Sequence, residues 1–229
     1  MKKSDRVELS LVMPCLNEEA AVAACIKEGQ KFFNKRKING EIIIVDNNST
    51  DNSAAIAKKC GTRVVEERVP GYGSALRKGL ASAKGERIIM GDCDMTYDFL
   101  HIDEMYDYLA DYDFVIGDRF KGGIAKNAMP LSHHIGVRVL SLAGRIRYGV
   151  RVHDFHCGIR GIRKDALKKV EYRTTGMEFA TEMIAEVGRK KLSVKEVPVK
   201  LRNGAEGRSP KLRTFRDGFR HLRYIILNP

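Results

Sequence analysis

Short apolar runs alternate with amphipathic stretches along the first 120 residues of the chain. Apolar runs between polar turns are typical of buried strands, and apolar residues at helical spacing predict helices. The predicted strands cover residues 8–13, 41–45, 62–66, 87–90 and 114–117. The predicted helices cover residues 18–33 with Asn17 as N-cap, a short segment ending at residue 59, and residues 71–84 and 100–110. A turn is predicted at Asn39-Gly40, and the whole alternation predicts a mostly parallel sheet with helices on both faces.

The second half of the chain is less regular. Apolar residues at helical spacing, with arginines between them, predict a helix at residues 131–148. A helix at 176–190 and a strand at 192–199 follow. Residues 202–211 indicate a basic loop, and residues 213–227 a basic helix. The expected fold class is α/β, with a Rossmann-like sheet and basic amphipathic helices toward the C-terminus.

The bulk properties suit a soluble globular chain. Its 229 residues are enough for one large domain, or for a domain with a C-terminal extension. No apolar run approaches the roughly 20 residues that a membrane span needs. The basic N-terminus leads into a strand rather than a signal segment, so the expected compartment is the cytosol. The five scattered cysteines indicate reduced thiols.

The net charge of +12 is unevenly distributed. Residues 1–119 hold 17 Lys and Arg against 20 Asp and Glu, a balance of −3, whereas residues 120–229 hold 24 against 9, a balance of +15. A basic half of this kind favours a polyanion, which can be nucleic acid, an anionic membrane surface or a phosphorylated substrate.

Carboxylates follow two of the predicted strands. Asp92 and Asp94 come directly after the strand at 87–90, and Asp46 follows the strand at 41–45. Ligand sites of α/β sheets lie beyond the carboxyl ends of the strands, and hard divalent cations take oxygen ligands together with substrate phosphates. This placement predicts a site for a nucleotide and a metal ion. If the Asp-x-Asp motif is taken alone, an ordinary acidic turn is the alternative explanation for it.

Short motifs occur along the chain in a fixed order. They are Pro14-Cys15-Leu16-Asn17-Glu18, Asp46-Asn47-Asn48-Ser49-Thr50-Asp51, Gly71-Tyr72-Gly73-Ser74-Ala75-Leu76-Arg77, Asp92-Cys93-Asp94, Gly117-Asp118-Arg119-Phe120-Lys121-Gly122-Gly123, His153-Asp154-Phe155-His156-Cys157-Gly158, Thr174 to Glu182, and Gly207-Arg208-Ser209. As an ordered set they resemble the inverting family 2 glycosyltransferases of the GT-A fold. The combination is similar to the dolichol- or polyprenyl-phosphate sugar synthase branch, and the match spans nearly the whole chain.

The resemblance implies a donor site with a metal ion. Residues 1–212 would form the GT-A catalytic domain, with a nucleotide and metal half at 1–119 and an acceptor half at 120–212. Mg²⁺ or Mn²⁺ held by Asp94, with Asp92 assisting, would neutralise the departing diphosphate as a Lewis acid. The implied nucleotide-sugar-binding residues are Pro14, Leu16, Asn17, Glu18, Asp46, Asn48, Gly73, Arg77, Asp92, Cys93, Arg202 and Arg208. Of these, Arg202 and Arg208, with Lys211, would belong to a lid over the diphosphate.

The acceptor side is implied in the same way. Arg119 and Arg138 match positions that bind an acceptor phosphate in the resembled family, and arginine suits bidentate phosphate contacts; solvated surface charge is the alternative. Asp154 matches an acceptor-side carboxylate that orients the acceptor or acts as a base, and a structural ion pair with a nearby arginine is the alternative. The expected catalytic residues are Asp94, Asp154, Arg119 and Arg138. The spacing His153-x-x-His156-Cys157 indicates zinc only weakly, since a fourth ligand is not evident.

Two basic amphipathic stretches, residues 131–148 and 213–229, favour contact with an anionic membrane surface. In the second stretch, Phe215, Phe219, Leu222, Tyr224, Ile225 and Ile226 are expected to face lipid. Docking of the helix onto the protein's own core is the alternative. The expected location is cytoplasmic and peripheral on the cytoplasmic membrane face.

Three functions stay open from the sequence. The first is metal-dependent transfer of a hexose from UDP-glucose or GDP-mannose to polyprenyl or dolichyl phosphate. The second keeps the donor but uses a soluble or polysaccharide hydroxyl acceptor, with Asp154 as a true base. The third is a nucleotide- or nucleic-acid-binding module without turnover. A basic platform interleaved with aromatics is not evident, so a nucleic-acid partner is not expected.

Overall fold

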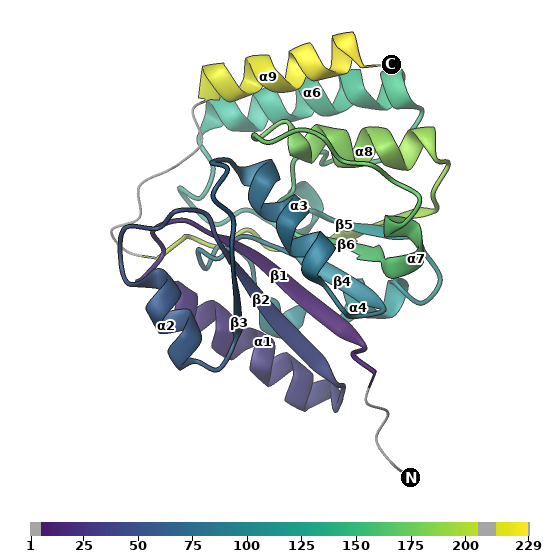
Figure 1. The fold of residues 1–229 in the computed structure, drawn as a ribbon. Helices are drawn as coiled ribbons and strands as arrows, with labels where there is room; N and C mark the ends of the chain where they lie inside the picture. Colours follow the sequence, from purple (N-terminus) through teal and green to yellow (C-terminus); the bar gives the residue numbers. More distant parts are fainter. Residues whose placement is uncertain (1–5, 206–213, 229) are drawn as a thin grey trace.

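The computed structural model describes residues 6–205 and 214–228. Seven strands form one sheet in the order β3-β2-β1-β4-β6-β5-β7 (Figure 1). The strands are β1 (Leu9–Cys15), β2 (Gly40–Asp46), β3 (Arg63–Glu66), β4 (Arg87–Met90), β5 (Phe114–Asp118), β6 (Arg160–Arg163) and β7 (Val194–Pro198). All residues of β5 and most of those of β1, β2 and β4 are buried, which explains their continuous apolar runs.

All strand pairs are parallel except those of β6, which pairs antiparallel with both β4 and β5. The mostly parallel α/β sheet expected from the sequence is thereby confirmed. Strand β6 was not predicted because an arginine stands at each end of its four residues. The fully buried Arg160 side chain is accommodated because it donates to the carbonyls of Phe155, Cys157 and Ala180.

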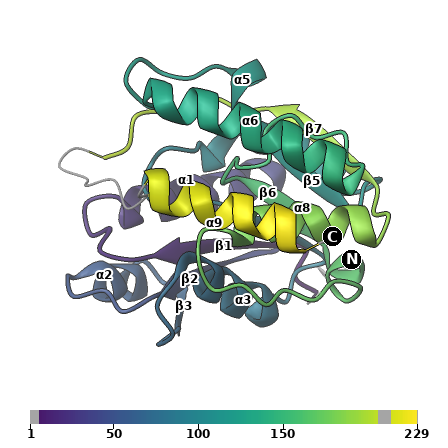
Figure 2. The same ribbon diagram turned by 90° about the horizontal axis from the view of Figure 1, so that it is seen from above.

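Helices cover both faces of the sheet. They are α1 (Val22–Arg36), α2 (Ser53–Lys59), α3 (Tyr72–Ser82), the 3₁₀ turn η1 (Phe99–His101), α4 (Asp103–Tyr108), α5 (Arg119–Gly122), α6 (Leu131–Tyr148), α7 (Lys164–Leu167), α8 (Phe179–Arg189) and α9 (Thr214–Leu227). In Figure 1, α1 and α2 lie on one face of the sheet, and α3 and α8 lie on the other. Figure 2 shows α6 and α9 running along one side of the molecule next to α8.

Three local predictions were wrong. The first helix begins at Val22 rather than after Asn17, because Asn17 has a left-handed φ of 51° and its side chain instead accepts a hydrogen bond from Thr50 N at 2.7 Å. Gly40 belongs to β2, and the chain turns at Lys37 in the left-handed region. The helix expected at 100–110 is divided into η1 and α4, where Asp98 accepts the Leu100 N–H and caps the first turn.

Helix α9 docks on the protein through one face. Asp217, His221, Tyr224 and Ile225 are buried there, so the expectation that Tyr224 and Ile225 face outward was wrong. Their spacing of four, three and one residues places them on one side of the helix, against α6 and α8. The prediction for Phe215 concerns a side chain outside the described residues.

An apolar surface remains exposed beside the docked face. Helix α6 exposes a stripe consisting of Leu131, Ile135, Val139, Leu142 and Ile146, and α9 exposes Phe219, Leu222 and Ile226. We call these eight residues the apolar stripe. Among residues 6–205 and 214–228, no helix has the length and hydropathy needed to cross a membrane.

Candidate functional site

The parallel register brings the acidic strand ends to one edge of the sheet. Cys15 at the end of β1 lies beside Asp46 at the end of β2, and Val12 of β1 lies beside Met90 at the end of β4. Strand β1 therefore lies between Asp46 on one side and Asp92 and Asp94 on the other, and all three residues leave the sheet at the same edge. The sequence expectation that these carboxylates share one edge agrees with this topology.

Asp94 is held rigidly in this edge. Its side chain is 2% exposed, and its Oδ1 accepts hydrogen bonds from the backbone N–H and the hydroxyl of Thr96. The Asp94 carbonyl accepts the N–H of Ala205 at 3.2 Å, and the Thr96 carbonyl accepts the N–H of Arg202 at 2.8 Å. Residues 202–205 thus cross directly over the Asp94 segment.

Asp92 lies between an aromatic hydroxyl and a glycine. Burial, and then the charge of Asp92, hold the pKa of the Tyr72 hydroxyl well above its ordinary value, so this hydroxyl keeps its proton and donates toward the carboxylate. A Cβ on Gly158 would approach Asp92 Oδ2 to 2.4 Å. Gly158 therefore leaves room for the carboxylate. Two carboxylates so placed fit a hard divalent cation such as Mg²⁺ or Mn²⁺.

The loop after β2 is fixed by side-chain amides. Asn47 donates to the carbonyls of Glu67 and Val69, and its Oδ1 accepts Gly71 N–H at 2.8 Å. Asn48, in the left-handed region with φ of 66°, donates to the Arg68 carbonyl. Among the described residues, the buried Oδ1 of Asp46 has no hydrogen-bond partner. A buried acceptor without a partner in the protein can accept a hydrogen bond from a bound ligand.

Other predicted nucleotide-site residues occupy the same edge. Glu18 is buried and its N–H donates to Ser53 Oγ at 2.7 Å, while Leu16 is 37% exposed. Pro14 lies in β1 opposite Val45, and Cys93 is buried between the two aspartates. Gly73 is the second residue of α3, where a Cβ would meet the Thr174 carbonyl at 2.6 Å, so a side chain there is sterically excluded.

Arg119 and Asp154 form a buried bidentate pair. Arg119 Nε and Nη2 lie 2.6 and 2.7 Å from the two carboxylate oxygens, and the Arg119 N–H donates to Oδ2 at 3.2 Å. The Asp154 side chain is 0% exposed. Of the roles considered for Asp154, this geometry corresponds to the ion pair with a nearby arginine. The carboxylate fixes the plane of the guanidinium.

A cavity of about 210 Å³ connects these groups beneath α6 and α9. Asp92 and Tyr72 line it together with the buried Arg119 and Arg160. Much of the remaining lining is apolar, and His133, His156 and His221 also contribute. The lining of the cavity thus combines carboxylates, which suit a cation, with guanidinium groups, which suit an anion.

The imidazoles of this cavity are neutral at physiological pH. Burial, followed by the charges of His221, Arg160 and Arg119, lowers the pKa of His156 well below its usual value. Burial is also the main cause that lowers the pKa of His221 to about 4. The two rings are in edge-to-face contact with centroids 4.4 Å apart, and Thr181 Oγ1 lies within hydrogen-bond distance of both. Among the described residues, the side chains close enough to share a metal ion include His153 but neither His156 nor Cys157.

Three predicted arginines lie elsewhere. Arg138 is exposed on α6, where its guanidinium stacks over Phe120 at 4.7 Å, and it does not line the cavity. Arg77 is exposed on α3 and donates to the Arg173 carbonyl at 3.0 Å. Arg202 contacts both Glu28 carboxylate oxygens at 3.0 Å and the carbonyls of residues 95 and 97, which gives it a structural role. Arg208 and Lys211 lie outside the described residues.

Two candidate site residues were missed in the sequence. Arg160 lies two residues beyond the motif that ends at Gly158 and was given no role, because a buried arginine cannot be distinguished from a surface one by pattern alone. Glu196 of β7 accepts the N–H groups of His153 and Asp154 at 2.6 and 3.1 Å, so it holds the segment that carries the ion pair. The alternation of polar and apolar residues in β7 offered no signal for this contact.

Protonation of His221 is expected to couple stability to pH. Because the folded-state pKa of about 4 lies below the unfolded value near 6.5, the unfolded chain takes up a proton first as the pH falls. The free energy of unfolding should therefore fall as the pH is lowered from 6.5 to 4. The part of this loss that comes from His221 is about 3 kcal/mol. Urea unfolding across this range measures the slope. His221→Gln should flatten it, whereas the exposed control His101→Gln should not; parallel profiles for His221→Gln and the unchanged protein contradict the assignment.

The fold and site define an α/β protein whose acidic sheet edge and buried arginines surround one ligand cavity. The sequence model of Glycosyl transferase family 2 matches residues 10–171, so the chain belongs to this family. The family expected from the ordered motifs is thereby confirmed.

Two relatives from Haloferax volcanii are similar over most of the chain. The low-salt glycan biosynthesis hexosyltransferase Agl6 is 38% identical over 223 residues, which cover 96% of this chain and 53% of the relative. The chain thus spans about half the length of Agl6. A dolichyl-phosphate hexose transferase is 29% identical over 199 residues, covering 86% of this chain and 84% of the relative.

Solved structures share the fold. Glucosyl-3-phosphoglycerate synthase from Mycobacterium tuberculosis, in complex with Mn²⁺, UDP and glucosyl-3-phosphoglycerate, superimposes with a TM-score of 0.75 at 22% identity. The alignment covers 98% of this chain and 80% of that one. The GT-A arrangement expected from the sequence is consistent with this likeness.

Proposed function

We propose that the protein is a metal-dependent inverting glycosyltransferase that moves a hexose from a nucleotide sugar to a polyprenyl or dolichyl phosphate. The observation that carries the proposal is the single cavity lined by both Asp92 and the buried Arg119. UDP-glucose and GDP-mannose are the donors considered. Residues 1–119 would bind the donor, residues 120–212 the acceptor, and residues 213–229 the membrane interface.

The donor side suits a nucleotide diphosphate. Mg²⁺ or Mn²⁺ held by Asp92 and Asp94 would supply positive charge to the departing diphosphate. The unpartnered Asp46 Oδ1 would accept an N–H group of the base. The solved synthase that shares the fold holds Mn²⁺ and UDP, which supports a metal and a nucleotide here. Residues 202–205, which cross over Asp94, would help to exclude water from the reacting sugar.

The acceptor side suits an anion that needs no general base. A phosphate monoester is already ionised near neutral pH, so it requires orientation and desolvation rather than deprotonation. Asp154 fixes the Arg119 guanidinium by two hydrogen bonds, and Arg160 adds a second buried positive charge to the cavity. Asp154 is committed to this pair, which disfavours it as the base that a hydroxyl acceptor would require. The dolichyl-phosphate hexose transferase among the relatives supports the same acceptor class.

A panel of donors and acceptors tests the proposal. Each nucleotide sugar is incubated with Mg²⁺ or Mn²⁺ and a short polyprenyl phosphate, and the lipid product is identified by mass spectrometry. A hexosyl-phospho-lipid is the expected product. A product formed only with a hydroxyl acceptor, or binding without turnover for every donor, overturns the proposed acceptor or the proposed activity respectively.

The apolar stripe is proposed to rest on the cytoplasmic face of an anionic membrane. Its residues lie on α6 and α9, whose arginines can approach lipid phosphates while the apolar side chains enter the interface. The cavity lies beneath the same two helices, so a lipid acceptor would have a short path to Arg119. This position accounts for the exposure of large apolar side chains on one side of the protein.

Charge introduced into the apolar stripe is expected to weaken membrane binding. The double variant Ile135→Glu and Ile146→Glu should weaken binding to anionic vesicles by more than about tenfold, since each change removes apolar burial worth over about 1 kcal/mol. Vesicle co-sedimentation measures the effect. Val69→Glu is the matched control, because Val69 is 53% exposed and lies outside the stripe. Equal binding of the double variant and the control contradicts the proposed surface.

A further inference from the structure

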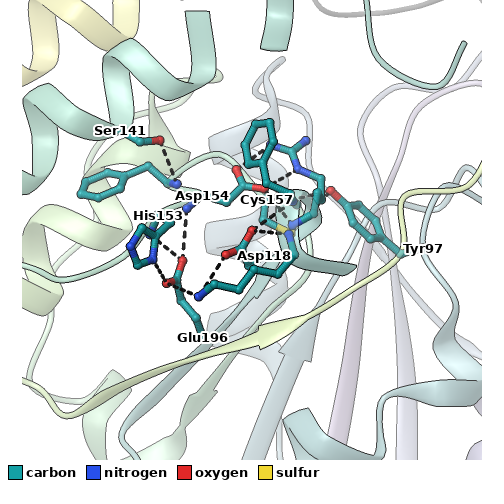
Figure 3. A network of polar contacts seen from close by, with 12 residues as sticks. Tyr97, Asp118, Ser141, His153, Asp154, Cys157 and Glu196 are labelled. Atoms are coloured by element: carbon teal, nitrogen blue, oxygen red, sulfur yellow. Dashed lines mark hydrogen bonds and ion pairs between the residues drawn. The ribbon is translucent and has the colours of Figure 1, made fainter. Parts of the chain in front are cut away.

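A second cluster of side chains that can ligate a metal ion lies next to the Arg119–Asp154 pair. Asp118 ends β5, Glu196 lies on β7, and His153 precedes Asp154 in the loop that follows α6 (Figure 3). One ligand atom from each of these three residues lies within 4.8 Å of the other two. His153 Nδ1 and Glu196 Oε2 are 2.6 Å apart. We call these three residues the β5–β7 cluster.

The two carboxylates of the β5–β7 cluster, Asp118 and Glu196, have buried side chains, and each turns one oxygen toward the same space. Asp118 is 1% exposed, and its Oδ1 accepts the N–H groups of Phe120 and Lys121. Its buried Oδ2 has no hydrogen-bond partner among the described residues. Glu196 Oε1 is occupied by the N–H groups of His153 and Asp154, which leaves Oε2 to face His153. Asp118 Oδ2 is thus buried without a hydrogen bond, and the cation paired with it is the Lys121 ammonium at 3.4 Å.

The charge of the region also favours a cation. Asp154 is neutralised by Arg119, whereas Asp118 and Glu196 share the ammonium of Lys121. The Lys121 Nζ lies 3.4 Å from Asp118 Oδ2 and 3.9 Å from Glu196 Oε2, distances longer than an ordinary charge-assisted hydrogen bond. The two carboxylates thus carry one negative charge in excess. The Lys121 side chain is 54% exposed, so its ammonium can move into solvent when another cation enters.

We propose that the β5–β7 cluster binds a transition-metal ion of the Zn²⁺ class. One imidazole nitrogen and two carboxylate oxygens form a ligand set suited to Zn²⁺, whereas Mg²⁺ prefers oxygen ligands alone. The half-exposed His153 leaves the fourth position open to water. The ion would replace the Lys121 ammonium and join the end of β5 and the middle of β7 to the loop that carries Asp154. This site is separate from Asp92 and Asp94 and does not depend on the proposed glycosyl transfer.

Zinc titration in competition with a chromophoric chelator tests the proposal. The titration uses the full chain in the Asp94→Asn background, which weakens metal binding at the other site, and expects one Zn²⁺ equivalent. His153→Ala should lose this equivalent. The matched control is His101→Ala, because His101 forms an exposed pair with Asp98 at 2.9 Å and represents adventitious surface binding. Lys121→Met should bind Zn²⁺ about tenfold more tightly, since it removes a competing positive charge.

Cobalt spectra identify the ligands independently of the binding constant. Co²⁺ in the same protein should give visible absorption bands of a tetrahedral nitrogen and oxygen site, and these should disappear in His153→Ala and in Glu196→Gln. Thermal unfolding of each variant without metal establishes that it is folded. A full equivalent retained by folded His153→Ala, or loss of the equivalent in His101→Ala, overturns the site. Zinc binding seen only in Lys121→Met overturns it for the natural chain.

Discussion

Replacing Asp94 with asparagine is expected to reduce glycosyl transfer by at least about 100-fold, with the fold unchanged. The asparagine amide keeps an oxygen that can accept the two Thr96 hydrogen bonds, so the local loop should persist. What is lost is the negative charge that would hold Mg²⁺ or Mn²⁺ against the donor diphosphate. Because that charge is needed most as the diphosphate leaves, the turnover number should fall more than the affinity for the acceptor.

Initial rates at saturating metal measure this effect, and Mn²⁺ titration measures the affinity for the ion. Asp111→Asn is a matched control, since Asp111 is an exposed aspartate remote from the sheet edge. Thermal unfolding and circular dichroism should superimpose for all three proteins. If Asp94→Asn retains the turnover of the unchanged protein, Asp94 is not a metal ligand in the reaction.

Replacing Arg119 with methionine is expected to cost about 3–5 kcal/mol in the free energy of unfolding, because it leaves Asp154 buried without its partner. The same variant should lose transfer to a polyprenyl phosphate, since it removes the guanidinium that faces the cavity. A loss of activity from Arg119→Met alone therefore has two causes, instability and a missing phosphate ligand.

The double variant Arg119→Met and Asp154→Asn separates these causes. Removing the unpaired charge should restore part of the stability without restoring activity. The exposed pair of Arg173 and Glu171, 3.0 Å apart, supplies the control: Arg173→Met should change stability by less than about 1 kcal/mol. Urea unfolding measures the stability of each variant, and initial rates measure its activity. Recovery of activity in the double variant would show that Arg119 acts only through stability and does not bind the acceptor.

The local sequence determined the strand ends and the chemistry placed there. The apolar runs of β1, β2, β4 and β5 could be recognised in the sequence because both faces of these central strands are covered. The acidic residues that follow such strands necessarily leave the sheet at its edge. The bounds of β4 and α6 agree with the prediction residue for residue. The family also follows from the sequence, because its motifs occur in order along the chain.

Tertiary contacts decided which charged side chains are paired with one another and which line the cavity. Asp154 and Arg119 are 35 residues apart and Arg202 and Glu28 are 174 apart, so neither pair leaves a periodic signal. Strand β6 escaped prediction because it has an arginine at each end, and the burial of Arg160 depends in part on the carbonyl of Ala180, 20 residues away. The orientation of α9 was likewise set by α6 and α8, which bury Tyr224 and Ile225 and leave Phe219 and Ile226 exposed.

By itself, then, the sequence determined the fold class, the family and the acidic edge, because these depend on residues close together in the chain. Only the tertiary structure committed Asp154 to Arg119, turned Arg138 and Arg77 away from the cavity, and gathered Asp118, His153 and Glu196 into one cluster. The physical reason is that burial and pairing determine what a charged side chain does, and both arise from distant segments that meet only when the chain folds.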